Sequence, residues 1–361
     1  MLVGRGKKRQ EHVVSESVLQ SEIAEQPEVI ARLLREGAAG VEAIAAGIRG
    51  RGVHHVVMAA RGSSDNAARY AQYLFGAHNR FTVTLATPSL FTRYQAPPQM
   101  SGALVVGVSQ SGESPDLVAV VEEGRRQGCP TLAITNVAGS PLTRVADHTI
   151  VLLAGQERSI AATKTYTAQL TALAMLSTAL AGDAAWQREL QRAPEFVAAA
   201  LAIEDAAIVA AAETLKSAGH GVVLGRGFNF ATAFEIALKA KELAYVAVEP
   251  YSSADFQHGP IALIDTGFAA IVVNVTGAVS AEVEDLLRAI VARGARPVVL
   301  SNQRASLAMA ASPIPLAEDM PEWLSPIAAI VPGQRLAFEL SRARGFDPDR
   351  PRGLQKVTKT T

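Results

Sequence analysis

Residues 105–114 read VVGVSQSGES, the end of an apolar strand followed by a turn rich in hydroxyl groups. A helical pattern begins directly after this turn, at Ser114-Pro115-Asp116. The first turn of a helix offers unpaired backbone N–H groups and a partial positive charge, so the stretch predicts a small anion pocket. It holds no lysine and lacks the GxxxxGK[ST] spacing, which excludes a nucleotide P-loop and favours a small phosphorylated metabolite. The alternative is an ordinary corner in which Ser114-Pro115-Asp116 acts only as a helix cap.

The composition excludes several classes of protein. A chain of 361 residues has the size of about two domains. Lys plus Arg equals Asp plus Glu at 34 each, so we expect no nucleic-acid partner and no membrane-surface partner. The one cysteine, Cys129, excludes a disulfide framework and fits a cytoplasmic location. We also expect no signal peptide, no membrane span, no metal and no cofactor, because no long apolar run and no metal-ligand spacing occurs.

Strand and helix patterns alternate along the chain. The apolar strand segments are too continuous to have a side that faces water, which indicates parallel sheets covered by helices on both faces. The predicted strands are 54–60, 81–86, 103–109, 131–135 and 148–154, and then 221–225, 268–275 and 297–301. The predicted helices are 63–77, 116–127 and 163–181, a helical stretch over 183–217, and then 229–245, 280–293 and 322–344. The fold class is therefore α/β.

The two halves of the sequence repeat at a fixed offset. Arg226-Gly227 follows Arg61-Gly62 by 165 residues, and the same offset relates 273–277 to 108–112. An offset held across separate elements indicates a duplicated domain. The second turn has lost most of the hydroxyl groups, so we expect one anion site per chain. The predicted parts are an N-terminal helical segment (1–45), a first domain (46–185), a helical connector (186–217), a second domain (218–346) and a tail (347–361).

Several separated motifs stand in an order that resembles one known family. They are Glu22–Pro27, Arg61–Ser64, the SQSGES turn, Ala161–Lys164, Lys239–Glu242, Gln257–Pro260 and Pro351–Lys356. The chain resembles the duplicated sugar-isomerase (SIS) domains, in particular the isomerase half of glucosamine-6-phosphate synthase and the free-standing amino-sugar-phosphate deaminases. The resemblance implies two doubly wound parallel-sheet SIS domains, each with three αβα layers. It also implies a phosphosugar ligand held by Ser64, Ser109, Gln110, Ser111, Ser114, Ala162, Thr163 and Lys239.

Glu242 is the candidate base of an aldose–ketose isomerisation, which must move a proton between C1 and C2 of the sugar. It lies in the predicted helix 229–245, three residues after Lys239 and on the same helix face. Taken from the residues alone, a solvent-facing ion pair with Lys239 is the simpler interpretation. The resemblance implies that Glu242 is the C1/C2 base.

His258 and Lys356 are the other two catalytic candidates. His258 lies in the turn 256–260, where a neutral imidazole could move the proton of ring opening; the alternative is a capping or solvated side chain. The family's equivalent histidine reaches into the neighbouring subunit, which implies a homodimer. A lysine as close to the chain end as Lys356 is ordinarily a solvated charge. The family's tail instead folds over the site, which implies that Lys356 can form an imine with the open-chain sugar.

Two positions depart from the synthase pattern. Arg61 stands where that pattern has Cys, and Ala162 stands where it has Ser. The alanine removes one hydroxyl contact to the ligand, whereas Arg61 either adds charge near the phosphate or bridges strand ends. Both departures count against strict synthase specificity. Lys164 is either a cation near the site or the partner of a structural salt bridge.

The predicted reaction converts glucosamine-6-phosphate and water to fructose-6-phosphate and ammonia. Glutamine-dependent synthesis is not expected, because the synthase uses an N-terminal cysteine and this chain begins Met1-Leu2-Val3.

Three alternatives stay open. The first is an ammonia- or partner-dependent aminotransferase of the synthase type. The second is a deaminase or deglycase of galactosamine-6-phosphate or fructosamine-6-phosphate, distinguished by loops such as 87–94. The third is a sugar-phosphate sensor without catalysis, against which residues 1–50 show no helix-turn-helix pair.

Overall fold

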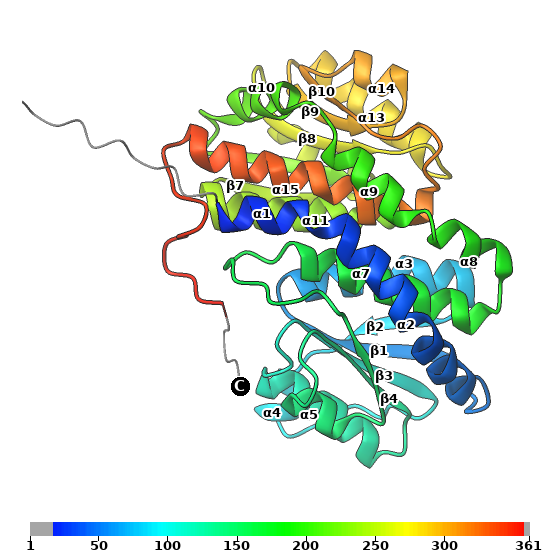
Figure 1. The fold of residues 1–361 in the computed structure, drawn as a ribbon. Helices are drawn as coiled ribbons and strands as arrows, with labels where there is room; N and C mark the ends of the chain where they lie inside the picture. The colour runs from blue at the N-terminus through cyan, green and yellow to red at the C-terminus, as the bar shows by residue number, and fades with distance from the viewer. Residues whose placement is uncertain (1–16, 357–361) are drawn as a thin grey trace, which may run out of the picture.

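Two five-stranded parallel sheets form the two halves of the molecule in the computed structural model, which describes residues 17–356 (Figure 1). The first sheet has the order β2-β1-β3-β4-β5 and the second the order β10-β9-β8-β6-β7. The strands are β1 (His55–Ala59), β2 (Thr82–Leu85), β3 (Ala103–Ser109), β4 (Thr131–Thr135), β5 (His148–Val151), β6 (His220–Gly225), β7 (Ala247–Ser252), β8 (Ala269–Asn274), β9 (Arg296–Ser301) and β10 (Ser312–Pro315). The parts of the predicted N-terminal segment and tail that fall on 1–16 and 357–361 lie outside the described residues.

Helices cover both faces of each sheet (Figure 1). Four of them, α3 (Ser63–Asn79), α7 (Lys164–Ala181), α11 (Phe230–Ala244) and α15 (Ser325–Ala343), lie between the two sheets. The outer faces carry α4 (Ser89–Thr92), α5 (Pro115–Arg126), α13 (Ser280–Ala292) and α14 (Arg304–Ala308). The remaining α-helices are α1 (Val18–Ala24), α2 (Gln26–Arg49), α6 (Pro141–Val145), α8 (Ala184–Leu190), α9 (Ala193–Leu201), α10 (Asp205–Leu215) and α12 (Ser253–Gln257). The predicted fold class, two doubly wound three-layer α/β domains related by duplication, is confirmed.

Burial explains why the central strands read as continuous apolar runs. Every residue of β3 and of β4 is buried, because helices cover both faces of the first sheet. From β1 the chain adds β2 on one side of the sheet and then crosses over to add β3 on the other side. Such a switch point between β1 and β3 opens a crevice at the carboxyl ends of the parallel strands. The SQSGES turn follows β3 and therefore lies at this crevice.

The sequence reading missed two strands, and both lie at the edges of the second sheet. These are β7, which reads AVEPYS, and β10, which reads SPIP. Their prolines and polar residues argue against a strand in sequence. At a sheet edge, however, the missing N–H of proline removes no hydrogen bond that a second neighbour would need. The position at the sheet edge thus explains why the sequence pattern of these two strands is weak.

Buried polar contacts join the two halves where the inner helices meet. Glu235 of α11 is fully buried and accepts hydrogen bonds from Ser63 Oγ at 2.8 Å and from Asn66 Nδ2 at 2.7 Å. Tyr70 of α3 donates its hydroxyl to the backbone oxygen of Trp323 at 2.9 Å. These contacts fix the start of α3, which follows β1, against the second half of the chain.

The second copy of the anion turn is filled by a side chain of the protein. Glu322 Oε2 accepts the backbone N–H of Ala278 at 2.9 Å, in the turn that follows β8. A Cβ atom on Gly277 would lie 2.1 Å from Glu322 Cδ, so the carboxylate lies directly against this glycine. The space equivalent to the predicted anion pocket is therefore occupied by a carboxylate in the second half.

Two glycines allow a matched test of the packing at the end of β6, where Gly225 lies against the backbone of Asn229. A Cβ atom on Gly225 would lie 2.3 Å from the backbone oxygen of Asn229, whereas one on Gly40 of α2 would meet no atom within 4 Å. We expect G225A to lower the free energy of unfolding by about 1–3 kcal/mol, because backbone must move. G40A is expected to raise it by about 0.5–1 kcal/mol, because alanine favours a helix. Urea denaturation measures both, and a G225A protein as stable as the parent would contradict this packing.

Candidate active site

A cavity of about 290 Å³ lies at the carboxyl ends of β1 and β3. Five segments build it: the turns after β1 and β3, the loop before α7, helix α11, and the tail. Nine of the eleven predicted site residues line it, namely Ser64, Ser109, Gln110, Ser111, Ser114, Ala162, Lys239, Glu242 and Lys356. The structure thus brings together residues that lie almost 300 positions apart in sequence. Their roles toward a ligand remain predictions.

Hydroxyl groups and the start of α5 form one end of the cavity, which we call the anion cradle. Gly112, with φ of 66°, allows the tight turn, and a Cβ there would lie 2.2 Å from Ser140 Oγ. The hydroxyl of Ser109 accepts the N–H of Gly112 at 3.1 Å. Ser114 stands at the N-cap of α5 but makes no capping hydrogen bond with its side chain. Its hydroxyl therefore does not serve as the helix cap considered above, and it lines the cavity instead.

Arg61 lines the cavity beside this cradle and also forms an ion pair. Its Nε and Nη2 atoms lie 2.9 and 2.8 Å from Oδ2 of Asp116, in the first turn of α5. Asp116 is buried, whereas about half of the Arg61 side chain is exposed. Both possibilities left open by the sequence hold in part: Arg61 bridges two loops at the strand ends, and it adds a cationic group to the cavity wall.

A carboxylate–ammonium–carboxylate row on α11 forms the other end. Lys239 Nζ lies 2.6 Å from Glu242 Oε2 and 3.4 Å from Glu235 Oε1. The prediction that Lys239 and Glu242 share a helix face is confirmed, and the simpler alternative of a solvent-facing pair is wrong, since Lys239 is buried and the Glu242 side chain is 22% exposed.

Electrostatics keep Lys239 charged in this row. Burial alone would lower the pKa of Lys239, but the attraction of Glu235 and Glu242 outweighs it and raises the pKa well above its ordinary value. For Glu235, burial is the largest effect and raises the pKa, although Lys239 and the hydrogen bond from Asn66 oppose it. Glu242, at the cavity surface, is the carboxylate of the row that a ligand can reach.

The tail places Lys356 in the cavity wall, where its Nζ lies 2.6 Å from Glu157 Oε2. The sequence reading did not single out Glu157, because the surrounding GQERS has the composition of an exposed loop. The side chain is nevertheless fully buried. A signal was present only in the nearby threonines, whose hydroxyl and N–H groups can satisfy a carboxylate at a helix start.

The other two predicted site residues, Thr163 and His258, lie elsewhere, and so does Lys164. Thr163 is buried next to the lining residue Ala162 and donates its N–H to Glu157 at 2.9 Å. His258 caps the end of α12, is exposed, and does not line the cavity of its own chain. Lys164 is buried in a salt bridge with Glu25 at 2.7 Å, which is the structural role considered for it above.

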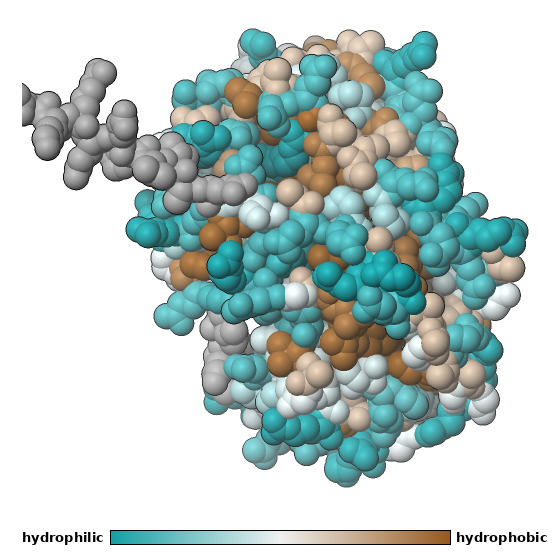
Figure 2. Space-filling view, in the orientation of Figure 1, coloured by the Kyte–Doolittle hydropathy of each residue, from teal (hydrophilic) through white to brown (hydrophobic). Residues whose placement is uncertain are grey.

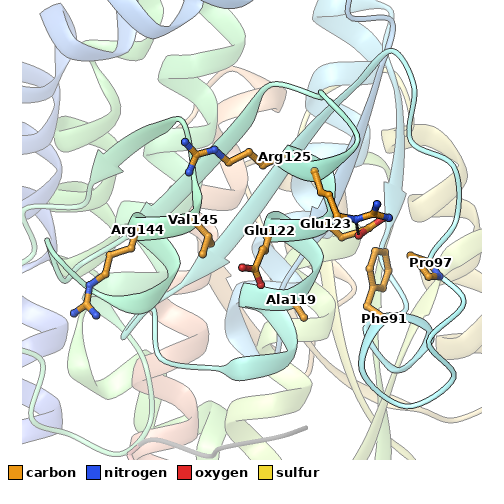
Figure 3. Close-up of a pocket in the computed structure, with 9 residues that line it drawn as sticks. Phe91, Pro97, Ala119, Glu122, Glu123, Arg125, Arg144 and Val145 are labelled. Carbon is orange, nitrogen blue, oxygen red and sulfur yellow. Dashed lines mark hydrogen bonds and ion pairs between the residues drawn. The ribbon is translucent and has the colours of Figure 1, made fainter.

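Two other hollows of the described residues lack this combination of hydroxyl groups and a lysine–carboxylate pair. A hollow of about 650 Å³ on the outer side of α5 (Figure 3) is lined by Phe91, Pro97, Ala119, Glu122, Glu123, Arg125, Arg126, Arg144 and Val145. Its Glu123 and Arg126 pair with each other, and Arg125 pairs with Asp147. Another hollow, between α2, α7 and α8, is lined mainly by apolar residues. Figure 2 shows hydrophobic side chains reaching the surface beside α2 on the face in view.

The described residues form neither a cluster of metal-ligating side chains nor a membrane-spanning helix. Within 17–356, no group of three or more His, Cys, Asp and Glu side chains could hold a metal ion. None of the described helices is long and apolar enough to cross a membrane.

Comparison with known proteins identifies relatives over most of this chain. The SIS domain model matches residues 51–179 and 214–330. Glutamine–fructose-6-phosphate aminotransferase (isomerizing) of Thermococcus kodakarensis is 36% identical over 93% of this chain and 56% of its own length. The chain therefore spans little more than half the length of this relative.

Solved structures agree with the sequence matches. The C-terminal domain of glucosamine-fructose-6-phosphate aminotransferase from Francisella tularensis is 27% identical, with a TM-score of 0.85, and the match covers 93% of this chain and 99% of that one. Glucosamine-6-phosphate deaminase from Thermotoga maritima has a TM-score of 0.76 at 23% identity over 95% of this chain and 100% of that one, which shows a shared fold. The duplicated α/β fold and the match of the family model to both halves show that this chain belongs to the SIS domain family.

Proposed function

We propose that this protein is an amino-sugar-phosphate deaminase/isomerase that converts glucosamine-6-phosphate and water to fructose-6-phosphate and ammonia. The observation that carries the proposal is one cavity with an anion cradle at one end and the Lys239–Glu242 pair at the other. A phosphate fits the cradle of Ser109, Ser111 and Ser114, because hydroxyl groups and the N-terminus of α5 favour negative charge there.

Glu242 is the proposed base. In the open-chain sugar, whose C2 carries an ammonium group, it takes the proton from C2 and gives it to C1, while one ammonium proton passes to the aldehyde oxygen, which becomes a hydroxyl group. The C2 nitrogen is then an iminium group, which water attacks, so that ammonia leaves and the ketone of fructose-6-phosphate remains. Lys239, held beside Glu242 at 2.6 Å, orients the carboxylate toward the cavity. Lys356 is the proposed amine for a second route at C2: its neutral amino group displaces ammonia from the iminium carbon to form an imine, and water then hydrolyses this imine to the ketone and the free lysine.

His258 is proposed to open the sugar ring in the cavity of a second copy of the chain. Its support is its position, since it is exposed at the end of α12 and does not line the cavity of its own chain. A homodimer of this kind would place His258 of each chain at the other's cavity.

A second candidate function follows from the names of the relatives. They are isomerizing aminotransferases, and the reverse of the proposed reaction forms glucosamine-6-phosphate from fructose-6-phosphate and ammonia. A separate partner that supplies ammonia would then set the direction. Incubation with fructose-6-phosphate and an ammonium salt, followed by amino-sugar detection, tests this candidate.

Ammonia release measured with purified protein and glucosamine-6-phosphate tests the proposed function. We expect E242Q to lower kcat by about 10²–10⁴-fold, because the general base is lost while the cradle is intact. The matched control is E249Q, the same change at an exposed residue of β7 outside the cavity, and it should retain the parent rate. Absence of ammonia from glucosamine-6-phosphate, galactosamine-6-phosphate and fructosamine-6-phosphate would overturn the proposal.

Mixed dimers test the proposed role of His258. E242Q and H258A proteins are each expected to be inactive when pure. Co-expressed at equal levels, they should recover about a quarter of the parent activity, because half of the dimers then carry one cavity with both native groups. No recovery in verified mixed dimers would show that His258 and Glu242 of the same chain act together, and a fully active H258A protein would show that His258 has no role.

A further inference from the structure

The carboxylate of Glu157 is fixed by the first turn of α7. Its Oε1 accepts the N–H groups of Thr163 at 2.9 Å and Thr165 at 3.1 Å, and its Oε2 accepts the Thr165 hydroxyl at 2.8 Å. Three donors and the positive end of an 18-residue helix thus stabilise the charge without any help from the tail.

The loop that carries Glu157 is held from its other side as well. Glu22 of α1 accepts the N–H of Arg158 at 2.5 Å and the N–H of Ser159 at 3.1 Å. The Ser159 hydroxyl also donates to Glu22. Because the loop is anchored on both flanks, the Glu157 carboxylate has a set position against the start of α7.

Before the tail reaches the Glu157 carboxylate, two of its residues, Asp349 and Arg352, contact the rest of the protein. Asp349 accepts the N–H groups of Val18 and Leu19 at 3.2 and 2.8 Å, where α1 begins. The Arg352 guanidinium lies 3.7 Å from the centre of the Tyr245 ring. Beyond Arg352, the Lys356–Glu157 ion pair is the one hydrogen bond that the described tail residues make to the cavity wall.

Glu157 does not line the cavity, whereas Lys356 does. A ligand in the cavity therefore meets Glu157 only through the ammonium group of Lys356. The Glu157 side chain is fully buried and the Lys356 side chain is 25% exposed, so the pair lies between a surface contact and a fully buried one. The other charged residues that line the cavity are Arg61, Lys239 and Glu242.

We propose that Glu157 is a positioning residue for Lys356: its fixed carboxylate holds the ammonium group of the tail lysine at the cavity. The catalytic part rests on the proposed function, but the docking of the tail does not. The proposal explains why a carboxylate is buried at the start of α7 with one acceptor position left for a residue 199 positions away.

Trypsin cleavage between Arg352 and Gly353, followed by mass spectrometry, measures tail docking without any activity. We expect E157Q to speed this cleavage by about tenfold or more, because the ion pair is lost while Gln still accepts N–H groups. K356M should do the same, and the double variant E157Q/K356M should be no faster than either single variant. The matched control E25Q changes an exposed carboxylate of the neighbouring Lys164 pair and should behave as the parent.

Kinetics separate positioning from a general effect on stability. E157Q is expected to lower kcat/KM by about tenfold, and E157Q/K356M to be no worse than K356M alone. Parent-like cleavage in both E157Q and K356M, or additive losses in the double variant, would overturn the inference.

If E157Q does not fold, the cleavage of K356M decides the question. A K356M tail that is cleaved as slowly as the parent tail would contradict docking. A parent protein that releases no ammonia from any amino-sugar phosphate would refute the proposed function and leave the cleavage result standing.

Discussion

The buried carboxylate of Glu235 is the contact on which the cavity depends. It binds Ser63 and Asn66 at the start of α3, which belongs to the first half, and it lies 3.4 Å from Lys239 of the second half. A buried carboxylate that loses its partners is strongly destabilising, so this geometry holds the two halves in one arrangement. The same contact places the turn after β1 opposite Glu242. The hydroxyl-rich turn after β3 and Glu242, the proposed general base, thereby line one cavity of about 290 Å³.

The duplication of the fold gives two crevices, and the chain uses them differently. In the first half the turn after β3 lines an open cavity, whereas in the second half Glu322 fills the turn after β8. An internal carboxylate at the start of α13 satisfies the backbone N–H of Ala278 as a bound anion would. The second half is thus free to supply Lys239 and Glu242 instead of a second phosphate site. This asymmetry supports one ligand per chain.

Local patterns in the sequence predicted the parts of the site that depend on short-range geometry. The spacing of Lys239 and Glu242 places both on one helix face, and the turn 109–114 is fixed by its own glycine and the helix that follows. The Lys356–Glu157 pair was not predictable in the same way, because its partners are 199 residues apart and the threonines after Glu157 do not indicate which cation it binds. The edge strands β7 and β10 were missed because the strand signal depends on burial that edge residues do not have.

A crystal structure with an open-chain analogue, 2-amino-2-deoxyglucitol 6-phosphate, tests the central claim most directly, because the analogue cannot complete the reaction. The account predicts one ligand per chain, with its phosphate hydrogen-bonded to the hydroxyl groups of Ser109 and Ser111 and with C1 and C2 beside Glu242. Glu322 should keep its contact with Ala278. A phosphate bound at the turn after β8, or an analogue bound with C1 and C2 remote from Glu242, would contradict it.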